Sequence, residues 1–154
     1  MAHRALTALL LLALALRAWA LSSELSAHLE RCATREGVPS WLVERLIEAE
    51  GMHENRSVEN ANGTFDHGIM SLNDLTIEDI RKERPEFDPY DEKESIAWGC
   101  AILARRREIF GCWYDAVGSW NLGVRGWTEY LNGERELPYA TRRILEYVFE
   151  GGNE

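Results

Sequence analysis

LIEAEGM, from Leu46 to Met52, and GIMSLN, from Gly68 to Asn73, are the two runs that decide the fold. Apolar residues recur at helical spacing before Glu50, and Gly51 is a residue type that commonly ends a helix, so Glu50 is expected in a last helical turn. The apolar second run then returns towards this turn. Ionising a carboxyl among apolar side chains is costly, so its pKa rises, which suits an acid that donates a proton near neutral pH.

Residues 1–20 have the features of a secretory signal peptide, with Arg4 at the basic start, an apolar run from Ala5 to Leu16, and a small-x-small site that ends at Ala20. The apolar run is shorter than the ~20 residues that span a bilayer. We therefore expect cleavage after Ala20 and a soluble, exported product, periplasmic or secreted. The remaining residues, 21–154, are expected to form one domain.

The chain is acidic, with a formal net charge of −9 at pH 7. Loss of Arg4 and Arg17 with the signal peptide would make the net charge about −11. No nucleic-acid partner is expected, because neutralising phosphates requires clustered Lys and Arg. The one dense basic run, Arg105–Arg107, falls inside an expected helix and is interpreted as a solvated helix face.

Capping residues, glycines and prolines divide residues 21–154 into helices. The expected helices cover residues 23–36, 39–50, 92–110 and 138–149, with shorter ones from 76 and at 114–120 and 127–131. The Asn-rich stretch from His53 to His67 is expected to be a loop with a short hairpin at Asn62-Gly63. Ile69 to Asn73 is expected to be extended, with one face inward. The predicted fold class is mainly α (α+β), with a small β element between the second and third helices.

Three motifs resemble a single family. Glu50 with Gly68–Asn73 is similar to the "ES…GLMQ" region of lytic transglycosylases, Ser119–Gly123 resembles their "AYNAG", and Pro138–Arg142 resembles their "P-x-E-T-R". The resemblance covers nearly all of residues 21–154, and it implies a lysozyme-like fold and peptidoglycan glycan strands as substrate. It is closest to the small one-domain members that open the cell wall for a secretion, pilus or conjugation apparatus, so it implies such a partner and a monomer.

The resemblance makes Glu50 the single catalytic acid and base, with no metal or organic cofactor. Glu50 would protonate the oxygen between N-acetylmuramic acid and N-acetylglucosamine, and then deprotonate the C6 hydroxyl, which closes the sugar as a 1,6-anhydro product. Glu48 lies about 200° around the helix, so both glutamates cannot face one cleft. Asp66 is interpreted as a turn residue that hydrogen-bonds its own backbone.

Substrate contacts are expected from the same three motifs. The residues at the family's GLMQ segment and its "YN" position flank the acid, and Trp120 is expected against a sugar ring. Tyr147 lies three residues after Ile144, which occupies the place of a family tyrosine, and the two share a helix face. Core or surface roles are the alternative for each of these side chains. The expected contacts are Met70, Ser71, Asn73, Trp120, Asn121 and Tyr147.

Three cysteines, Cys32, Cys100 and Cys112, imply one disulfide and one leftover thiol in an oxidising compartment. Cys100 and Cys112 are separated by about 18 Å of helix, so Cys32 is expected to pair with one of them. Family members tie a first-helix cysteine to one near a D-P-C segment. Here Asp88-Pro89-Tyr90 lacks that cysteine, and Cys100 is the preferred partner. No Cys-x-x-Cys or His-x-x-x-His spacing indicates a metal site.

Three positions depart from the family pattern: Gly51 replaces a serine, Ser71 a glutamine and Leu122 an alanine. The first two lie beside the acid, where small misplacements of the substrate cost much in rate. Two alternative functions therefore stay open. One is a hydrolase like goose-type lysozyme, in which water replaces the C6 hydroxyl. The other is a non-catalytic module that holds glycan strands.

Overall fold

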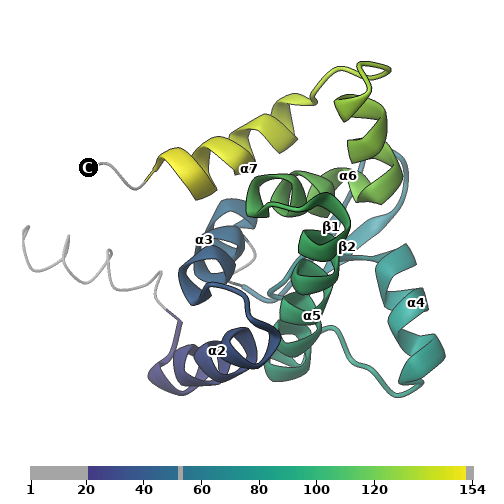
Figure 1. Cartoon of the computed structure of the whole chain (residues 1–154). Helices are drawn as coiled ribbons and strands as arrows, with labels where there is room; N and C mark the ends of the chain where they lie inside the picture. Colours follow the sequence, from purple (N-terminus) through teal and green to yellow (C-terminus); the bar gives the residue numbers. More distant parts are fainter. Residues whose placement is uncertain (1–20, 52–53, 152–154) are drawn as a thin grey trace, which may run out of the picture.

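Helix α5 (Glu92–Phe110) runs through the centre of the protein, and the other elements pack around it (Figure 1). The computed structural model describes residues 21–51 and 54–151, so the predicted signal peptide lies outside the described residues. The described residues form six helices and one antiparallel sheet with the order β1-β2-β3. The elements besides α5 are α2 (Ser23–Glu36), α3 (Ser40–Glu50), β1 (Ser57–Glu59), β2 (Phe65–His67), β3 (Leu72–Asn73), α4 (Asp74–Glu83), α6 (Trp113–Leu131) and α7 (Tyr139–Glu150).

The helix ends follow the capping chemistry of the sequence. The Ser22 side chain accepts a hydrogen bond from the Leu25 amide at the start of α2, and Asp91 accepts from two amides at the start of α5. Gly37 and Gly51 end α2 and α3 in the left-handed conformation that favours glycine. The predicted bounds of these helices are confirmed to within a residue, as is the mainly α class with its β element between the second and third helices.

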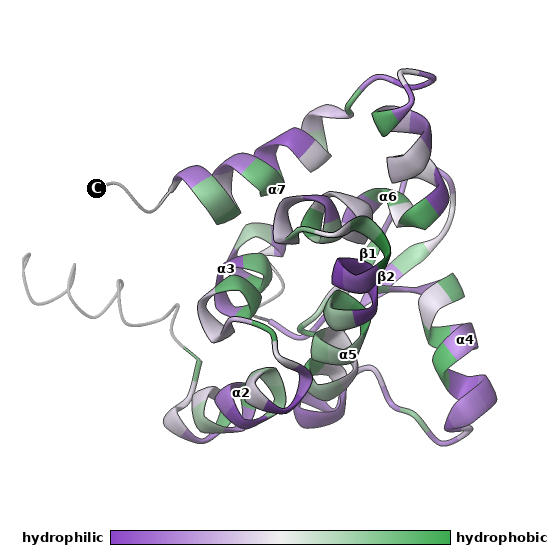
Figure 2. Cartoon of the chain, in the orientation of Figure 1, coloured by the Kyte–Doolittle hydropathy of each residue, from purple (hydrophilic) through white to green (hydrophobic). Residues whose placement is uncertain are grey.

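The core forms where α5 meets its neighbours. Helices α2 and α6 pack against α5, and α3 packs against α7. Each outer helix alternates hydrophobic and hydrophilic segments (Figure 2), so it buries one stripe and exposes the other. Fully buried side chains of these helices include Leu29, Leu42, Ile96, Leu103 and Trp127.

Helix α6 consists of two helical parts on either side of a kink, which agrees with the prediction of two short helices, but both parts are longer than predicted. It is continuous from Trp113 to Leu131 except for a break at Gly123, which has φ 71° and ψ 167°. This backbone geometry is accessible to glycine and strained for other residues. The break follows Trp120 and Asn121 directly, so it shapes the segment that was expected to contact substrate.

The predicted hairpin is confirmed. Strand β1 pairs with β2, with Ser57 opposite His67, and the Thr64 amide donates to the Asn62 side chain within the turn. Asp66, however, lies in the middle of β2 and opposes Asn73 of β3. Its interpretation as a turn residue is wrong, because the strand extends through it.

The extended segment predicted for Ile69–Asn73 is also largely wrong. Gly68 to Ser71 forms a turn, closed by a hydrogen bond from the Ser71 amide to the Gly68 carbonyl (3.1 Å), and only Leu72 and Asn73 are extended. Both Ile69 and Met70 are buried, so the alternation of faces does not hold. Helix α4 also begins two residues earlier than predicted, because the Asn73 side chain caps it.

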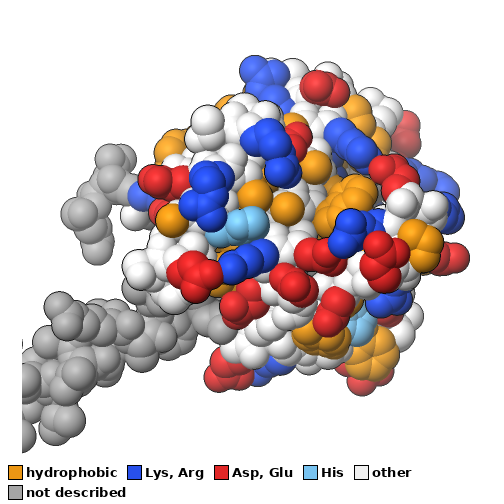
Figure 3. Space-filling model, turned by 90° about the horizontal axis from the view of Figure 1, so that it is seen from below, with side chains coloured by type: hydrophobic (Ala, Val, Ile, Leu, Met, Phe, Trp, Pro, Cys, Tyr) orange, Lys and Arg blue, Asp and Glu red, His pale blue; other side chains and the backbone are white. Residues whose placement is uncertain are grey.

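The surface viewed from below Figure 1 carries acidic and basic side chains interspersed, without an extended basic patch on this face (Figure 3). This arrangement agrees with the acidic net charge and offers no electrostatic footprint for phosphates on that face. Within the described part of the chain, no helix combines the length and the apolar character that crossing a bilayer requires.

We predict that Gly68→Ala destabilises the protein by ~2 to 4 kcal/mol, from left-handed strain and overpacking together. Gly68 has φ 70°, and a Cβ atom there would collide with the Pro89 carbonyl. Gly63→Ala is the matched control, because Gly63 has φ 80° but no neighbour within 4 Å of a built Cβ. The free energy of unfolding of the control, measured by urea denaturation, should fall by only about 1 kcal/mol. Equal losses in the two variants would contradict the close approach to Pro89.

Candidate active site

Glu50 is the last residue of α3, and its carboxyl lies between the helix end and the turn that follows β2. Its side chain is largely enclosed but retains some exposure. The pKa of Glu50 is raised to about 7, mainly by burial and also by the nearby Asp66 carboxylate, while a hydrogen bond with the Ser71 side chain opposes the rise. A carboxyl with this pKa is populated in both protonation states near neutral pH, as acid and base catalysis in sequence requires.

Ser71 reaches Glu50 because of its own backbone. It has φ 52°, a left-handed conformation that is uncommon for a residue with a side chain. Such conformations cost free energy and persist where the surroundings enforce them, often at functional sites. The expected place of Ser71 beside the acid is therefore confirmed, although a turn and not an extended strand puts it there.

Asp66 is a residue of the site that the sequence prediction missed. Asn73 Nδ2 donates to Asp66 Oδ1 (2.8 Å) and to Thr64 Oγ1 (3.0 Å), which holds the carboxylate in a fixed orientation. The amide of Asn73 is thereby occupied by protein partners, and its oxygen caps α4. Asn73 thus orients the second carboxylate, and its predicted contact with substrate stays a prediction.

His67 supports this strand from the other side of the backbone. Its Nε2 lies 2.8 Å from Asp74 Oδ1, and its Nδ1 lies 2.7 Å from the Tyr90 hydroxyl. The pKa of Asp74 is lowered by a hydrogen bond from the Phe65 amide and by His67, so Asp74 is an acceptor and Nε2 of His67 is the donor. The sequence prediction included His67 only as the last residue of an expected loop, whereas it lies in β2. No local pattern shows the network, because Tyr90 follows His67 by 23 residues.

Met70 lies beneath the site. It is only 1% exposed and packs on α5 at Gly99, where a Cβ atom would meet the Met70 side chain. Gly99 therefore leaves the space that lets the turn approach α5. A direct contact between Met70 and substrate stays a prediction, and it would require the side chain to leave this packing.

Trp120 and Asn121 lie together at the end of the first part of α6. Arg106 of α5 stacks on Trp120, with its Cζ 5.8 Å from the ring centroid. The Thr141 hydroxyl of α7 donates to Asn121 Oδ1 (2.7 Å), so the amide nitrogen of this exposed side chain points away from that contact. Two different helices thus hold this pair in place. Their predicted roles in substrate binding stay predictions.

Tyr147 is not brought to Glu50. Its hydroxyl donates to Glu48 Oε2 (2.9 Å), and Glu48 points away from the side of α3 that carries Glu50. Ile144, three residues earlier on α7, is buried. The role of Tyr147 in substrate binding stays a prediction.

Cys32 and Cys100 are both buried, whereas Cys112 is exposed at the start of α6. Burial, followed by the proximity of Cys32, raises the pKa of Cys100 to about 12. Cys32 Sγ also lies 3.3 Å from His28 Nε2. The structure contains these two cysteines as free thiols, Cys32 on α2 and Cys100 on α5. The predicted Cys32–Cys100 disulfide stays a prediction.

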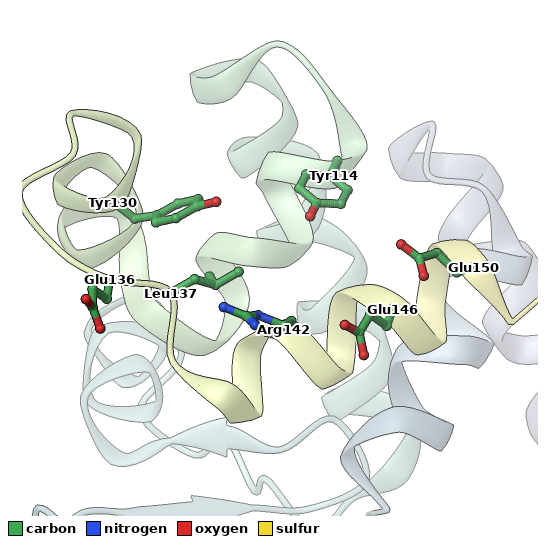
Figure 4. A pocket seen from close by; sticks show the side chains of 7 residues that line it. All are labelled: Tyr114, Tyr130, Glu136, Leu137, Arg142, Glu146 and Glu150. Carbon is green, nitrogen blue, oxygen red and sulfur yellow. The ribbon is translucent and has the colours of Figure 1, made fainter.

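Two of the cavities outside this set of residues border α6. One, of about 560 Å³, lies between α6 and α7 and contains none of the predicted site residues (Figure 4). It is lined by Tyr114, Tyr130, Glu136, Leu137, Arg142, Glu146 and Glu150. The other is a groove of about 240 Å³ between α4, α5 and α6, bounded by Trp98, Ile102 and Arg106 among others. Residues 21–51 and 54–151 contain no group of three or more His, Cys, Asp or Glu side chains arranged to hold a metal ion.

Comparison with known proteins matches most of the chain to one family. Residues 29–141 match the family described as the transglycosylase SLT domain. The chain is 27% identical over 132 residues to Protein IpgF of Shigella flexneri, covering 79% of this chain and 81% of that protein. It is 26% identical over 111 residues to a peptidoglycan-binding-like protein of Escherichia coli O157:H7, covering 70% of this chain and 64% of that protein. The predicted family and its mainly α lysozyme-like fold are confirmed.

We predict that Glu50→Gln gains stability relative to the wild type as pH rises. The pKa of Glu50 is raised from 4.5 to about 7 on folding, so the native state binds more protons between these values and the wild type loses stability as pH rises through them. Glutamine has no such loss, so the stability of the variant relative to the wild type should rise by ~3 kcal/mol from pH 4 to pH 8.

Urea unfolding of both proteins at the two pH values measures the gain. Glu48→Gln is the matched control, because it removes a carboxyl two residues away and leaves Glu50 in place. The control should keep the pH dependence of the wild type. A Glu50→Gln variant less stable than the wild type at pH 8 would show that Glu50 is an ionised structural partner.

Proposed function

The chain belongs to the transglycosylase SLT family, whose substrate is peptidoglycan, and we propose that it is a lytic transglycosylase that cleaves the β-1,4 bond between N-acetylmuramic acid and N-acetylglucosamine and leaves 1,6-anhydro ends. The observation that carries the proposal is the single carboxyl of Glu50, enclosed at the end of α3 with a pKa of about 7. An acid in this state can give a proton to the glycosidic oxygen at neutral pH.

The mechanism proposed for the site uses Glu50 twice. The protonated carboxyl donates to the leaving glycosidic oxygen, and the substrate acetamido group stabilises the cationic sugar carbon. The resulting carboxylate then accepts the proton of the C6 hydroxyl, whose oxygen bonds to that carbon and closes the anhydro ring. Ser71 supports the first step, because its hydrogen bond favours the ionised form that Glu50 reaches when it gives up its proton.

Asp66 supports a second candidate, a hydrolase of the same bond. Hydrolases commonly use two carboxylates, one as acid and one as base or nucleophile. Asp66 is close enough to Glu50 to raise its pKa, and Asn73 orients its carboxylate. In this candidate Asp66 would activate a water molecule, and water would replace the C6 hydroxyl.

The setting of the enzyme is also proposed. The signal-peptide features of residues 1–20 support export to the periplasm or medium, where peptidoglycan is accessible. The resemblance to small one-domain members supports a role in opening the wall for a secretion, pilus or conjugation apparatus. We propose that the protein acts there as a monomer and without a metal or organic cofactor.

We predict that Glu50→Gln abolishes release of soluble fragments from purified peptidoglycan, with a loss of at least ~10³-fold, because no other group can protonate the leaving oxygen. Mass spectrometry of the wild-type products identifies the reaction, since an anhydro product is one water lighter than a reducing-end product. Reducing-end products would establish the hydrolase. Binding of the wild type to peptidoglycan without cleavage at any pH would establish a binding module, and unchanged activity of Glu50→Gln would remove Glu50 from the mechanism.

We predict that Asp66→Asn moves the alkaline limb of the activity profile to lower pH. The Asp66 charge raises the pKa of Glu50, so its removal lets Glu50 ionise at lower pH and shortens the range in which the acid is protonated. Initial rates of peptidoglycan solubilisation from pH 4 to pH 9 measure the limb. A variant that keeps anhydro products with a shifted limb supports an electrostatic role for Asp66, whereas complete loss of activity at every pH supports the hydrolase candidate.

A further inference from the structure

Arg106 is a partly buried cation that the sequence prediction misinterpreted. Arg105 is exposed, as a solvated face requires, but Arg106 turns inward towards α6. Its Nη1 donates to the Ser119 carbonyl and lies 3.4 Å from Ser119 Oγ, and its guanidinium stacks on Trp120. The arginine is thus anchored at the segment that carries Trp120 and Asn121.

The charge of Arg106 has no carboxylate partner among the described residues. Its neighbour Arg105 pairs with Glu83 (3.9 Å), but no ion pair within residues 21–51 and 54–151 includes Arg106. Burial alone lowers the pKa of Arg106 to about 10. An arginine has five N–H donors, and the contacts with Ser119 use only Nη1. Burying an unpaired charge is costly, so the arrangement is one that an anionic ligand would complete.

Arg106 also forms part of the wall of the 240 Å³ groove between α4, α5 and α6. Trp98, Ile102 and Val124 give this groove an apolar lining. An apolar and aromatic lining with placed polar groups is typical of sites for small organic ligands. Asp79 and Glu83 line the opposite wall on α4, so an anion in the groove is favoured only on the side of α5.

We propose that Arg106 is a specificity-determining residue that binds a carboxylate of the muramyl unit and thereby favours peptidoglycan over neutral N-acetylglucosamine polymers. This inference rests on the proposed function. N-acetylmuramic acid differs from N-acetylglucosamine by a lactyl ether with a carboxyl group, and the stem peptides attached to it carry further carboxylates. The planar guanidinium matches a carboxylate through two parallel hydrogen bonds, which an ammonium or an amide cannot reproduce.

The test measures binding to three tetrasaccharide probes in the full chain that carries Glu50→Gln, so that the probes are not cleaved. The first probe is chitotetraose. The second consists of two linked GlcNAc-MurNAc disaccharides without peptide, so that its lactyl carboxylates are free, and the third is the same dimer with stem peptides. In this background, Arg106→Gln should weaken binding of the carboxylate probes by about 10-fold to 100-fold. Chitotetraose binding should change by less than about twofold, because it has no carboxylate.

The pattern over the probes identifies the carboxylate. Weaker binding of the peptide-free dimer alone points to the lactyl carboxylate, because this group is an amide when a peptide is attached. Weaker binding of the peptide-bearing dimer alone points to a carboxylate of the stem peptide. Arg106→Lys should restore binding in part, since it keeps the charge without the planar fork. Arg107→Gln is the matched control, because Arg107 stacks on Trp113 and does not line the groove, and it should bind all three probes as the parent does.

Two results separate failure of the inference from failure of the proposed function. An equal loss for all three probes, or no loss for any, would overturn the specificity role and leave Arg106 as a support for Ser119. This outcome is compatible with full cleavage of peptidoglycan by the wild type. A wild type that neither cleaves peptidoglycan nor binds any probe overturns the proposed function, and the inference with it.

Discussion

The close approach of the Gly68–Ser71 turn to α5 and to the Pro89 backbone is the constraint on which the site depends. Two missing side chains permit it: Gly99 leaves room for Met70, and Gly68 leaves room for the Pro89 carbonyl. With the turn seated at this depth, Ser71 reaches Glu50 and β2 lies beside the end of α3. The position of the acid therefore depends on packing at two glycines that never touch it.

The same approach sets the electrostatics of the acid. Burial would by itself keep Glu50 protonated, and the Asp66 carboxylate acts in the same direction. The hydrogen bond from Ser71 acts against both, and it leaves the pKa near 7 instead of higher. A group that must donate a proton and then accept one benefits from this balance, because neither form is strongly favoured. The left-handed backbone of Ser71 is the local cost of the arrangement.

The sequence predicted the parts of this structure that depend on local chemistry. Ser22, Gly37, Gly51 and Asp91 cap helices through contacts with residues a few positions away, so their bounds could be predicted. The hairpin at Asn62-Gly63 follows from its turn residues for the same reason. Glu50 was predicted to be the catalytic acid because its helix end, the following glycine and the apolar run together resemble a motif of lytic transglycosylases, and such a short motif can be seen in the sequence.

The missed features depend on contacts between distant residues. Asp66 gains its place from pairing with Asn73, and His67 from Tyr90, and neither contact has a local pattern. Ser71 was expected beside the acid, but its turn follows from two left-handed residues that periodicity does not indicate. Arg106 was misinterpreted because a run of three arginines on a helix is usually solvated, and only the packing of α6 on α5 turns one of them inward.

Under the proposed function, an acidic protein acts on an acidic polymer and must overcome repulsion, and the role proposed for Arg106 addresses this problem. The chain carries a net charge of −9, and the stem peptides of peptidoglycan are also negative. Repulsion between exposed charges is screened beyond about 8 Å at physiological ionic strength, so it weakens the approach of the substrate only modestly. A guanidinium that is withdrawn from solvent is screened much less, and its attraction for a carboxylate acts only when the glycan is seated in the groove. Under the proposed role, the overall negative charge would therefore limit non-specific adhesion to the cell wall. The partly buried Arg106 would bind a muramyl unit only when that unit is correctly placed in the groove.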